Sequence, residues 1–282
     1  MSRRNCVVLL LVICLMASMI TPVCAANTQQ DKADNVLSDG TVVESDAIVL
    51  RSMEDVEKMI KDDEQQYAQE YAAKVSKIDP QLKKDFAEFT ANNTDTNFTS
   101  YDEVIDAFQS TYPEYRNADI EGDVVTLQSN VTADLVRDFF NLNGYTIALA
   151  LFNHSLTSNP AKAYLDIIGN TGGIYSDIRT QLTSKYDFVQ KMITFSRAGS
   201  NQVTISNSSD YIFNKTNTDM YWAIHGFTWK RTRTAYNKAY FKIIDIYDFE
   251  SGPSITGVVA SMAGTHDFDV EIYGLVQNGV LK

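Results

Sequence analysis

The sequence predicts an α+β protein with a helical N-terminal half and an antiparallel β-sheet in the C-terminal half. Two observations support this class. From Ser52 to Pro113, apolar residues recur every three or four positions, which is typical of amphipathic helices. From about Thr194 onward, apolar and polar residues alternate as in strands, and the connections are too short for the crossover helices of a parallel sheet.

The first 25 residues have the composition of a signal peptide. Two arginines precede a nearly unbroken apolar run at 7–20, and small residues at Val23 and Ala25 fit a cleavage site near Ala25. The run is shorter than the roughly 20 residues that span a bilayer. A lipid anchor on Cys24 is disfavoured, because the residues before it lack the expected leucine and small residue. All three cysteines lie in this segment, at Cys6, Cys14 and Cys24.

The mature chain is therefore expected to be secreted, cysteine-free and acidic. The sequence has 24 basic and 36 acidic residues, a net charge of −12. This balance argues against nucleic acid, whose binding needs a basic surface. No later stretch is long and apolar enough for a transmembrane helix. An extracellular protein without disulfides favours a bacterial source.

The N-terminal half divides into a tail and a helical region. Residues 26–50 are interpreted as a flexible acidic tail, with a short β-like run at 47–50 that could pair with a sheet. Residues 51–117 are predicted to form a helical region. Its three helices are expected to start at Ser52, at Asp79-Pro80 and at the capping box Ser100–Glu103, and Pro113 ends the third.

Residues 118–282 are predicted to form an α+β domain. A strand is expected at 123–128, an apolar helix at 133–156, and a further helix from Ser158 to Gly169. An amphipathic stretch at 174–192 precedes the sheet. The predicted strands of the sheet are 202–206, 221–233, 239–249 and 267–276.

The hairpin at 221–250 holds the residues best suited to catalysis. A turn near 235–237 would bring His225 close to either Asp245 or Asp248, depending on a one-residue difference in register. An imidazole beside a carboxylate can act as a general acid–base, and Arg231 or Arg233 could hold an anionic substrate. The competing interpretation is a core histidine with arginines that neutralise an acidic surface. No Gly-x-Ser-x-Gly elbow, His-Glu-x-x-His motif or phosphate-binding glycine loop supports an enzyme.

The same hairpin suggests a binding surface. Tyr221, Phe227 and Trp229 would share one strand face, followed on that face by Arg231 and Arg233. Aromatic rings flanked by arginines could stack on a sugar or a peptide. The competing interpretation is that these rings form the core side of the sheet.

Three carboxylates, Asp267, Asp269 and Glu271, alternate near the C-terminus. Calcium prefers such ligands, but alternate strand residues are roughly 6.5–7 Å apart, too far for one ion to bind all three. A solvated acidic face is expected instead, and no metal site or cofactor is predicted. His154 ends the apolar helix without an identifiable partner.

The leading hypothesis is a secreted, non-catalytic protein that binds a protein, peptide or glycan through its C-terminal sheet. The second hypothesis is a secreted hydrolase that uses His225 with Asp245 or Asp248. The third is a toxin that perturbs membranes through the apolar segment 147–152.

Overall fold

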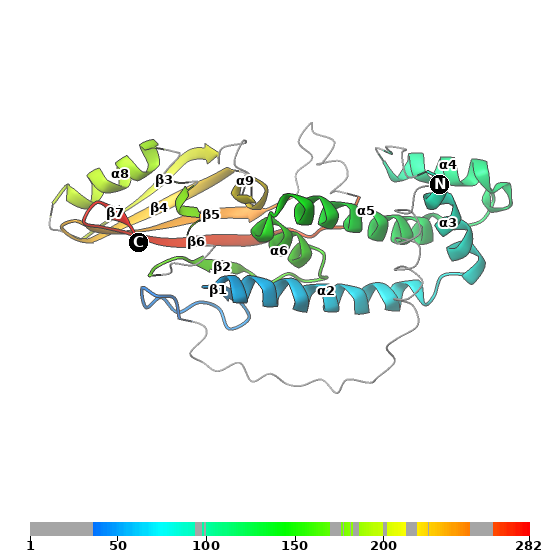
Figure 1. The fold of residues 1–282 in the computed structure, drawn as a ribbon, viewed down its shortest axis with the longest axis horizontal. Helices are drawn as coiled ribbons and strands as arrows, with labels where there is room; N and C mark the ends of the chain where they lie inside the picture. The colour runs from blue at the N-terminus through cyan, green and yellow to red at the C-terminus, as the bar shows by residue number, and fades with distance from the viewer. Residues whose placement is uncertain are drawn as a thin grey trace. The chain divides into compact units, whose positions relative to one another are not determined.

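The helices of the chain lie mostly before residue 160 and its strands mostly after it, which confirms the predicted α+β class (Figure 1). The computed structural model describes residues 36–93, 98, 100–169, 176, 178–180, 182, 186–199, 202–212, 219–224, 226–248 and 262–282. The predicted signal peptide at 1–25 and the candidate residue His225 lie outside the described residues.

Local capping signals start the three helices predicted in the N-terminal half. Helix α2 (Met53–Val75) begins after Ser52, whose hydroxyl accepts the Asp55 N–H while the Asp55 carboxylate accepts the Ser52 N–H. Helix α3 (Pro80–Asn92) begins after Asp79, and helix α4 (Tyr101–Thr111) begins after Ser100. A 3₁₀ turn, η1 (Pro113–Tyr115), follows α4. All three predicted starts are confirmed.

The next predicted elements were wrong in two places. Residues 123–128, expected as a strand, lie in helix α5 (Glu121–Asn143), where Val124 and Leu127 share a buried side at helical spacing. The helix expected at 133–156 is two helices. Helix α5 ends at Gly144, whose φ of 69° lies in the left-handed region that stops helices, and α6 (Thr146–Ser155) follows.

The segment from Ser158 to Gly169, expected as a helix, instead contains strand β2 (Ala163–Asp166). All four residues of β2 are buried, because the strand has neighbours on both sides and both of its faces are covered. A strand buried in this way has no polar–apolar alternation, so its sequence does not distinguish it from a buried helix.

The described strands form one mixed sheet in the order β1-β2-β6-β5-β4-β3, with β7 paired to β6. Strands β3 to β6 pair antiparallel, as predicted, whereas β1, β2 and β6 are parallel neighbours. The parallel pairing of β1 and β2 is possible because five helices, α2 to α6, make the crossover. The strand pairing predicted for 47–50 is thereby confirmed. The remaining strands are β1 (Ile48–Leu50), β3 (Val203–Ile212), β4 (Gly226–Ala235), β5 (Lys238–Tyr247), β6 (Phe268–Gln277) and β7 (Val280–Leu281).

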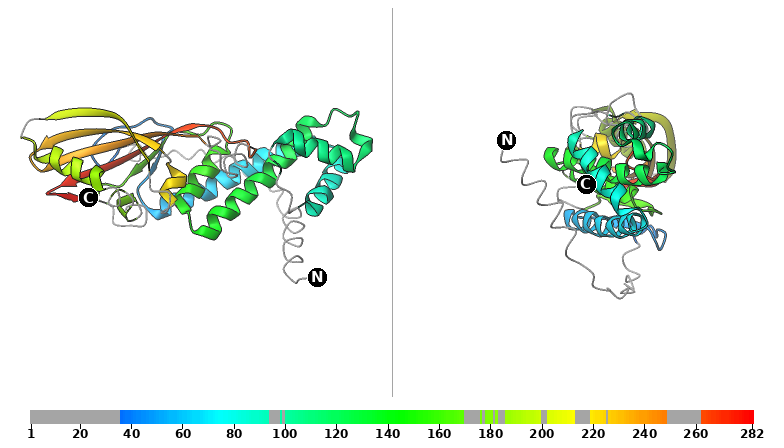
Figure 2. Two further views of the ribbon diagram at one scale, coloured as in Figure 1. Left: turned by 90° about the horizontal axis from the view of Figure 1, so that it is seen from above. Right: turned by 90° about the vertical axis from the view of Figure 1, so that its right-hand side faces the viewer.

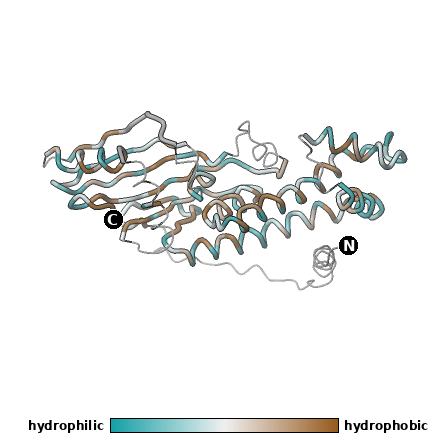
Figure 3. Tube along the Cα trace, turned by 45° about the horizontal axis from the view of Figure 1, so that its top comes forward, coloured by the Kyte–Doolittle hydropathy of each residue, from teal (hydrophilic) through white to brown (hydrophobic). Residues whose placement is uncertain are grey.

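One face of the sheet carries the main core. Helix α8 (Tyr186–Arg197) packs against β4, β5 and β6 (Figure 2). Helix α6 packs against α2, α5 and α9 (Asp219–Ala223), and its residues 147–155 are all buried. The apolar segment 147–152 is therefore a core helix in this structure. Figure 3 shows hydrophobic positions recurring along the strands and along the helices beside them.

The opposite face of the sheet is covered near β1, β2 and β6 by residues 36–47 of the predicted tail. Leu37, Val43 and Ala47 are buried against the rings of Tyr164 and Tyr273. The buried carboxylate of Asp166 accepts the N–H of Ser38 at 2.6 Å. This part of the tail is consequently attached to the sheet.

A second apolar cluster joins α3, α4 and the first turns of α5, and the rings of Phe86, Phe89 and Phe108 meet at its centre. Residues 35–282 form one compact unit. Among the described helices, none combines the length and the hydropathy needed to cross a membrane.

Candidate functional site

The predicted hairpin exists, but its first aromatic residue lies elsewhere. Strands β4 and β5 join through a two-residue turn at 236–237, where Ala235 pairs with Lys238. Tyr221, expected on the strand, belongs to helix α9, and its ring contacts Trp222 edge-on at 5.5 Å. The prediction that Tyr221 shares a strand face with Phe227 and Trp229 was therefore wrong. A single turn of helix with so few residues leaves little periodicity to detect.

Phe227 and Trp229 are core residues. Their exposed fractions are 5% and 1%, and the Trp229 ring lies 4.7 Å from the ring of Phe188 on α8. Neither ring offers a free face on the surface for a sugar or a peptide. The competing interpretation, the core side of the sheet, describes this pair.

Arg231 and Arg233 both pack against the end of helix α8. Their guanidinium groups lie 4.8 and 5.5 Å from the centre of the Phe195 ring, and Arg233 donates a hydrogen bond to the Phe195 carbonyl at 3.3 Å. Cations are favourable at a helix C-terminus, where unpaired carbonyls carry partial negative charge. These arginines thus stabilise the end of α8.

The two candidate aspartates differ in their surroundings. Asp245 is half-buried on the β5 face that also carries Ile243 and Tyr247, and burial raises the pKa of its carboxyl to about 7. The nearby charge of Asp248 adds to this rise, while the Ile246 N–H opposes it. Asp248 follows β5 and is exposed. Arg231 pairs with Phe241, four residues from Asp245 on β5, so the arginine and the carboxylate are separated by roughly 13 Å along the strand.

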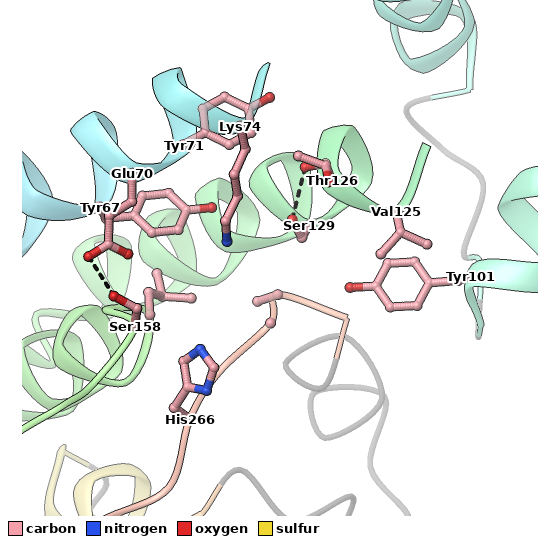
Figure 4. A pocket seen from close by; sticks show the side chains of 13 residues that line it. Tyr67, Glu70, Tyr71, Lys74, Tyr101, Val125, Thr126, Ser129, Ser158 and His266 are labelled. Atoms are coloured by element: carbon pink, nitrogen blue, oxygen red, sulfur yellow. Dashed lines mark hydrogen bonds between the residues drawn. The ribbon is translucent and has the colours of Figure 1, made fainter. Parts of the chain in front are cut away.

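A cleft of about 260 Å³ lies away from this hairpin, where five segments meet (Figure 4). Helix α2 contributes Tyr67, Glu70, Tyr71 and Lys74. The other lining side chains come from α4, the start of α5, the turn after α6 and the segment before β6; they are Tyr101, Val125, Thr126, Ser129, Leu156, Ser158, Ala263 and His266, with Gly264 contributing backbone.

The polar groups of the cleft are of two kinds. Four of its groups are already bonded: the Tyr101 hydroxyl donates to the Met262 carbonyl, Ser129 and Thr126 donate to backbone carbonyls of α5, and Ser158 donates to Glu70 at 2.9 Å. Their oxygens keep lone pairs that can accept hydrogen bonds from a ligand.

The polar groups of the second kind carry hydrogen-bond donors that no described residue uses. The Tyr67 hydroxyl, the Lys74 ammonium and the His266 ring make no hydrogen bond or ion pair with any residue that the structure describes. Burial raises the pKa of Tyr67 above its ordinary value, so its hydroxyl keeps its proton. In Figure 4 the Tyr67 hydroxyl and the Lys74 ammonium point toward the middle of the cleft, and the His266 ring lies opposite them.

The aromatic wall of the cleft is held from behind. The rings of Tyr67 and Tyr71 stack one helical turn apart, with centroids 6.1 Å apart and an interplanar angle of 11°. The Arg137 guanidinium of α5 lies 4.8 Å from the Tyr67 ring, and it also donates to Asn153 of α6 at 2.8 Å. Asn153 donates in turn to Glu64 of α2. These contacts fix the helix face that carries the two rings.

The turn after α6, which supplies Leu156 and Ser158, is positioned by a buried histidine. His154 is 4% exposed; its Nδ1 lies 3.1 Å from the Asp63 carboxylate and its Nε2 lies 2.9 Å from the Ala161 carbonyl. Because a carbonyl oxygen only accepts, Nε2 carries a proton. The partner that the sequence did not identify for His154 is thus Asp63, on the same helix as the tyrosines.

The C-terminal carboxylates do not gather into a metal site, and no group of three or more potential metal ligands occurs among the described residues. Asp267 and Asp269 are exposed, as expected, but Glu271 is 4% exposed and lies between Lys162 and Lys242, at 2.7 and 2.8 Å. Burial by itself raises the pKa of Glu271, but the hydrogen bonds from both lysines lower it below its ordinary value. The prediction of a fully solvated face was wrong for Glu271.

Sequence reasoning missed the cleft, although a signal for it exists. Tyr67 and Tyr71 occupy the apolar stripe of α2 where aliphatic residues suffice for packing, and each brings a polar tip. No family model matches this chain, and a search of curated proteins finds no significant similarity.

Proposed function

We propose that this protein is an exported, non-catalytic binding protein that holds a single sugar residue, free or part of a glycan, in the cleft between α2 and α5. The glycan hypothesis from the sequence is retained, but the proposed surface moves from the face of the C-terminal sheet to a cleft bordered by the segment that enters β6. The observation that supports it is the pair of tyrosine rings on α2 beside the unused hydrogen-bond donors of Tyr67, Lys74 and His266.

The size and the lining of the cleft favour a sugar. Its volume of about 260 Å³ lies below the roughly 300–1,000 Å³ of sites for drug-sized molecules, so it fits a ligand of about one ring. The C–H face of a sugar can lie against a tyrosine, and its hydroxyls can meet both the donors and the acceptors of the lining. Among the described residues of the cleft, the Ser158 hydroxyl is hydrogen-bonded to the Glu70 carboxylate but to no histidine or lysine that could act as its base, which supports a binding role.

Titration calorimetry with a panel of neutral and acidic monosaccharides tests this function. At least one sugar should bind with a dissociation constant near ~1 mM, the range expected for one ring. Tyr67→Phe removes only a hydroxyl and should weaken binding several-fold with little change in thermal stability. Tyr236→Phe, at the exposed hairpin turn, is the matched control and should bind normally. Absence of binding by every sugar at ~10 mM would overturn the proposal.

Export is part of the proposal and has its own test. Intact-mass analysis of the protein recovered from the culture medium of a bacterial host should give a chain that starts near Ala26. A full-length chain retained in the cells would contradict it.

We propose the secreted hydrolase as the second candidate, because the carboxyl of Asp245 has a pKa raised to about 7, which suits a general base. Its partners would be His225 and Asp248. Hydrolysis of chromogenic ester, peptide or glycoside substrates by the wild type, lost in Asp245→Asn, would support it. Equal rates for the wild type and Asp245→Asn would exclude this role for Asp245.

A further inference from the structure

We propose that the sugar bound in the cleft is acidic, with its carboxylate held by Lys74 and the Tyr67 hydroxyl and with its ring hydroxyls facing Glu70 and Ser158. This inference rests on the proposed function and names the chemical class of its ligand.

Lys74 is the principal observation. Its ammonium lines the cleft and makes no ion pair within the part of the chain that the structure describes, although acidic residues outnumber basic ones 36 to 24 in the sequence. The nearest acid on its own helix face, Glu70, lies one turn away and its carboxylate is turned toward Ser158 in Figure 4. A lysine directed into a cleft and left without a carboxylate suits a ligand that supplies one.

The Tyr67 hydroxyl strengthens this assignment. Its oxygen points to the same part of the cleft as the Lys74 ammonium, and burial keeps it protonated as a donor. An ammonium and a phenol that converge can each donate to one carboxylate, and hydrogen bonds with a charged partner are about twice as strong as neutral ones. His266 lies across the cleft and offers a further ring nitrogen.

The carboxylate of Glu70 is suited to a ligand that also carries hydroxyl groups as hydrogen-bond donors. One of its oxygens accepts hydrogen bonds from both Ser158 and Gln66, at 2.9 and 2.8 Å. The carboxylate is thus fixed in the wall as an acceptor, which a simple dianion cannot approach without repulsion. A uronic acid has one carboxylate for Lys74 and several hydroxyls that can donate to Glu70. A free amino acid would place an ammonium there instead and is the alternative that the experiment separates.

The test compares D-glucuronate with D-glucuronamide, which has the same shape and no charge, by titration calorimetry on the full chain. Glucuronate should bind about tenfold more tightly than glucuronamide. Lys74→Gln should abolish that preference, so that the two ligands bind with equal affinity. Lys61→Gln, an exposed lysine elsewhere on α2, is the matched control and should keep the preference.

The outcomes distinguish this inference from the proposed function. Equal affinity for the two sugars would overturn the acidic-ligand assignment, while the sugar-binding function would stand. A preference that persists in Lys74→Gln would overturn the role of Lys74. Binding of glycine or serine but of no sugar would overturn both, because the ligand would then be an amino acid. Absence of binding by the whole panel would overturn the function and this inference with it.

Discussion

Replacement of Gly274 by alanine probes the packing of the sheet most directly. Gly274 lies on β6 directly opposite Phe241 of β5, and the Phe241 ring covers it on the core side. A Cβ added at Gly274 would lie 2.1 Å from Cζ of that ring and 2.5 and 2.8 Å from its two Cε atoms. Carbon atoms pack at about 3.5–4.0 Å, so the ring would have to withdraw by about 1.4 Å.

The surroundings leave no room for this movement. Phe241 is 1% exposed and its ring meets Phe188 of α8 edge-on at 5.4 Å. Overpacking a close-packed core costs typically ~1–3 kcal/mol, and three clashing ring atoms favour the upper end. Gly274 does not have a positive φ, so alanine also restricts the unfolded chain and returns ~0.4–1 kcal/mol. We expect a net loss of about 2 kcal/mol.

Thermal and urea unfolding followed by circular dichroism measure this loss. For a chain of this size, about 2 kcal/mol corresponds to a decrease in Tm of roughly 4–8 °C. Gly122→Ala is the matched control, because a Cβ there meets nothing within 4 Å and lies in helix α5; it should leave stability unchanged or raise it by up to ~1 kcal/mol.

A double-mutant cycle decides whether the ring causes the loss. In a Phe241→Leu background the clashing ring atoms are absent, so Gly274→Ala should be nearly neutral there. The reasoning is refuted if Gly274→Ala changes the free energy of unfolding by less than about 0.5 kcal/mol, or if its effect is the same in both backgrounds.

Three further predictions concern charged groups in the fold. Asp219→Ala removes the carboxylate that accepts hydrogen bonds from the Ile147 and Ala148 N–H groups at the start of α6, at 2.9 and 2.7 Å. It should lower the free energy of unfolding in urea melts by about 1–2 kcal/mol, and a loss below ~0.3 kcal/mol would contradict this. His154→Leu leaves Asp63 buried without its partner and should lower the free energy of unfolding by about 3 kcal/mol. The Asp63→Asn, His154→Leu double variant should recover part of this loss, and equal stabilities of the single and double variants would count against the pair. Burial raises the folded-state pKa of Asp245 to about 7, from an unfolded value of ~3.9, so the folded state binds the proton more tightly. The contribution of Asp245 to stability is therefore greatest below pH ~4 and is lost as pH rises to about 7. The decrease in Tm from pH 5 to pH 8 should be smaller in Asp245→Asn than in the wild type, and identical decreases would exclude this effect.

The sequence predicted those features of the fold that depend on neighbouring residues. The pairs Ser52 with Asp55 and Ser100 with Glu103 start helices within one turn, so their chemistry is complete in a few positions. Strands β4 and β5 were predicted because apolar and more polar residues alternate along each of them.

The remaining features depend on partners far away in the chain. Strand β2 is buried on all sides because β1 and β6 flank it, and nothing within Ala163–Asp166 reports those neighbours. The tryptophan of the hairpin, Trp229, is core because α8 covers it. The same limit applies to Glu271, whose two lysine partners come from the segment before β2 and from β5.

The candidate site shows this limit most clearly. The sequence places Tyr67 and Tyr71 on one face of a helix, but the cleft exists only where α2 meets the turn after α6 and the segment before β6. The sequence did not indicate a partner for His154, because Asp63 lies 91 residues earlier, in another helix.

The central position of β2 has a consequence for the order in which the chain folds. Strand β2 leaves the ribosome before β3, β4 and β5, and its neighbour β6 follows only after them. Until β6 is complete, β2 lacks one of its two partners and α8 lacks part of the sheet on which it packs. Pairings between such distant segments form slowly, because long loops must close first. Under the proposed export, this delay would keep the unpaired strands unfolded for longer, and an unfolded segment is what a secretion channel can thread.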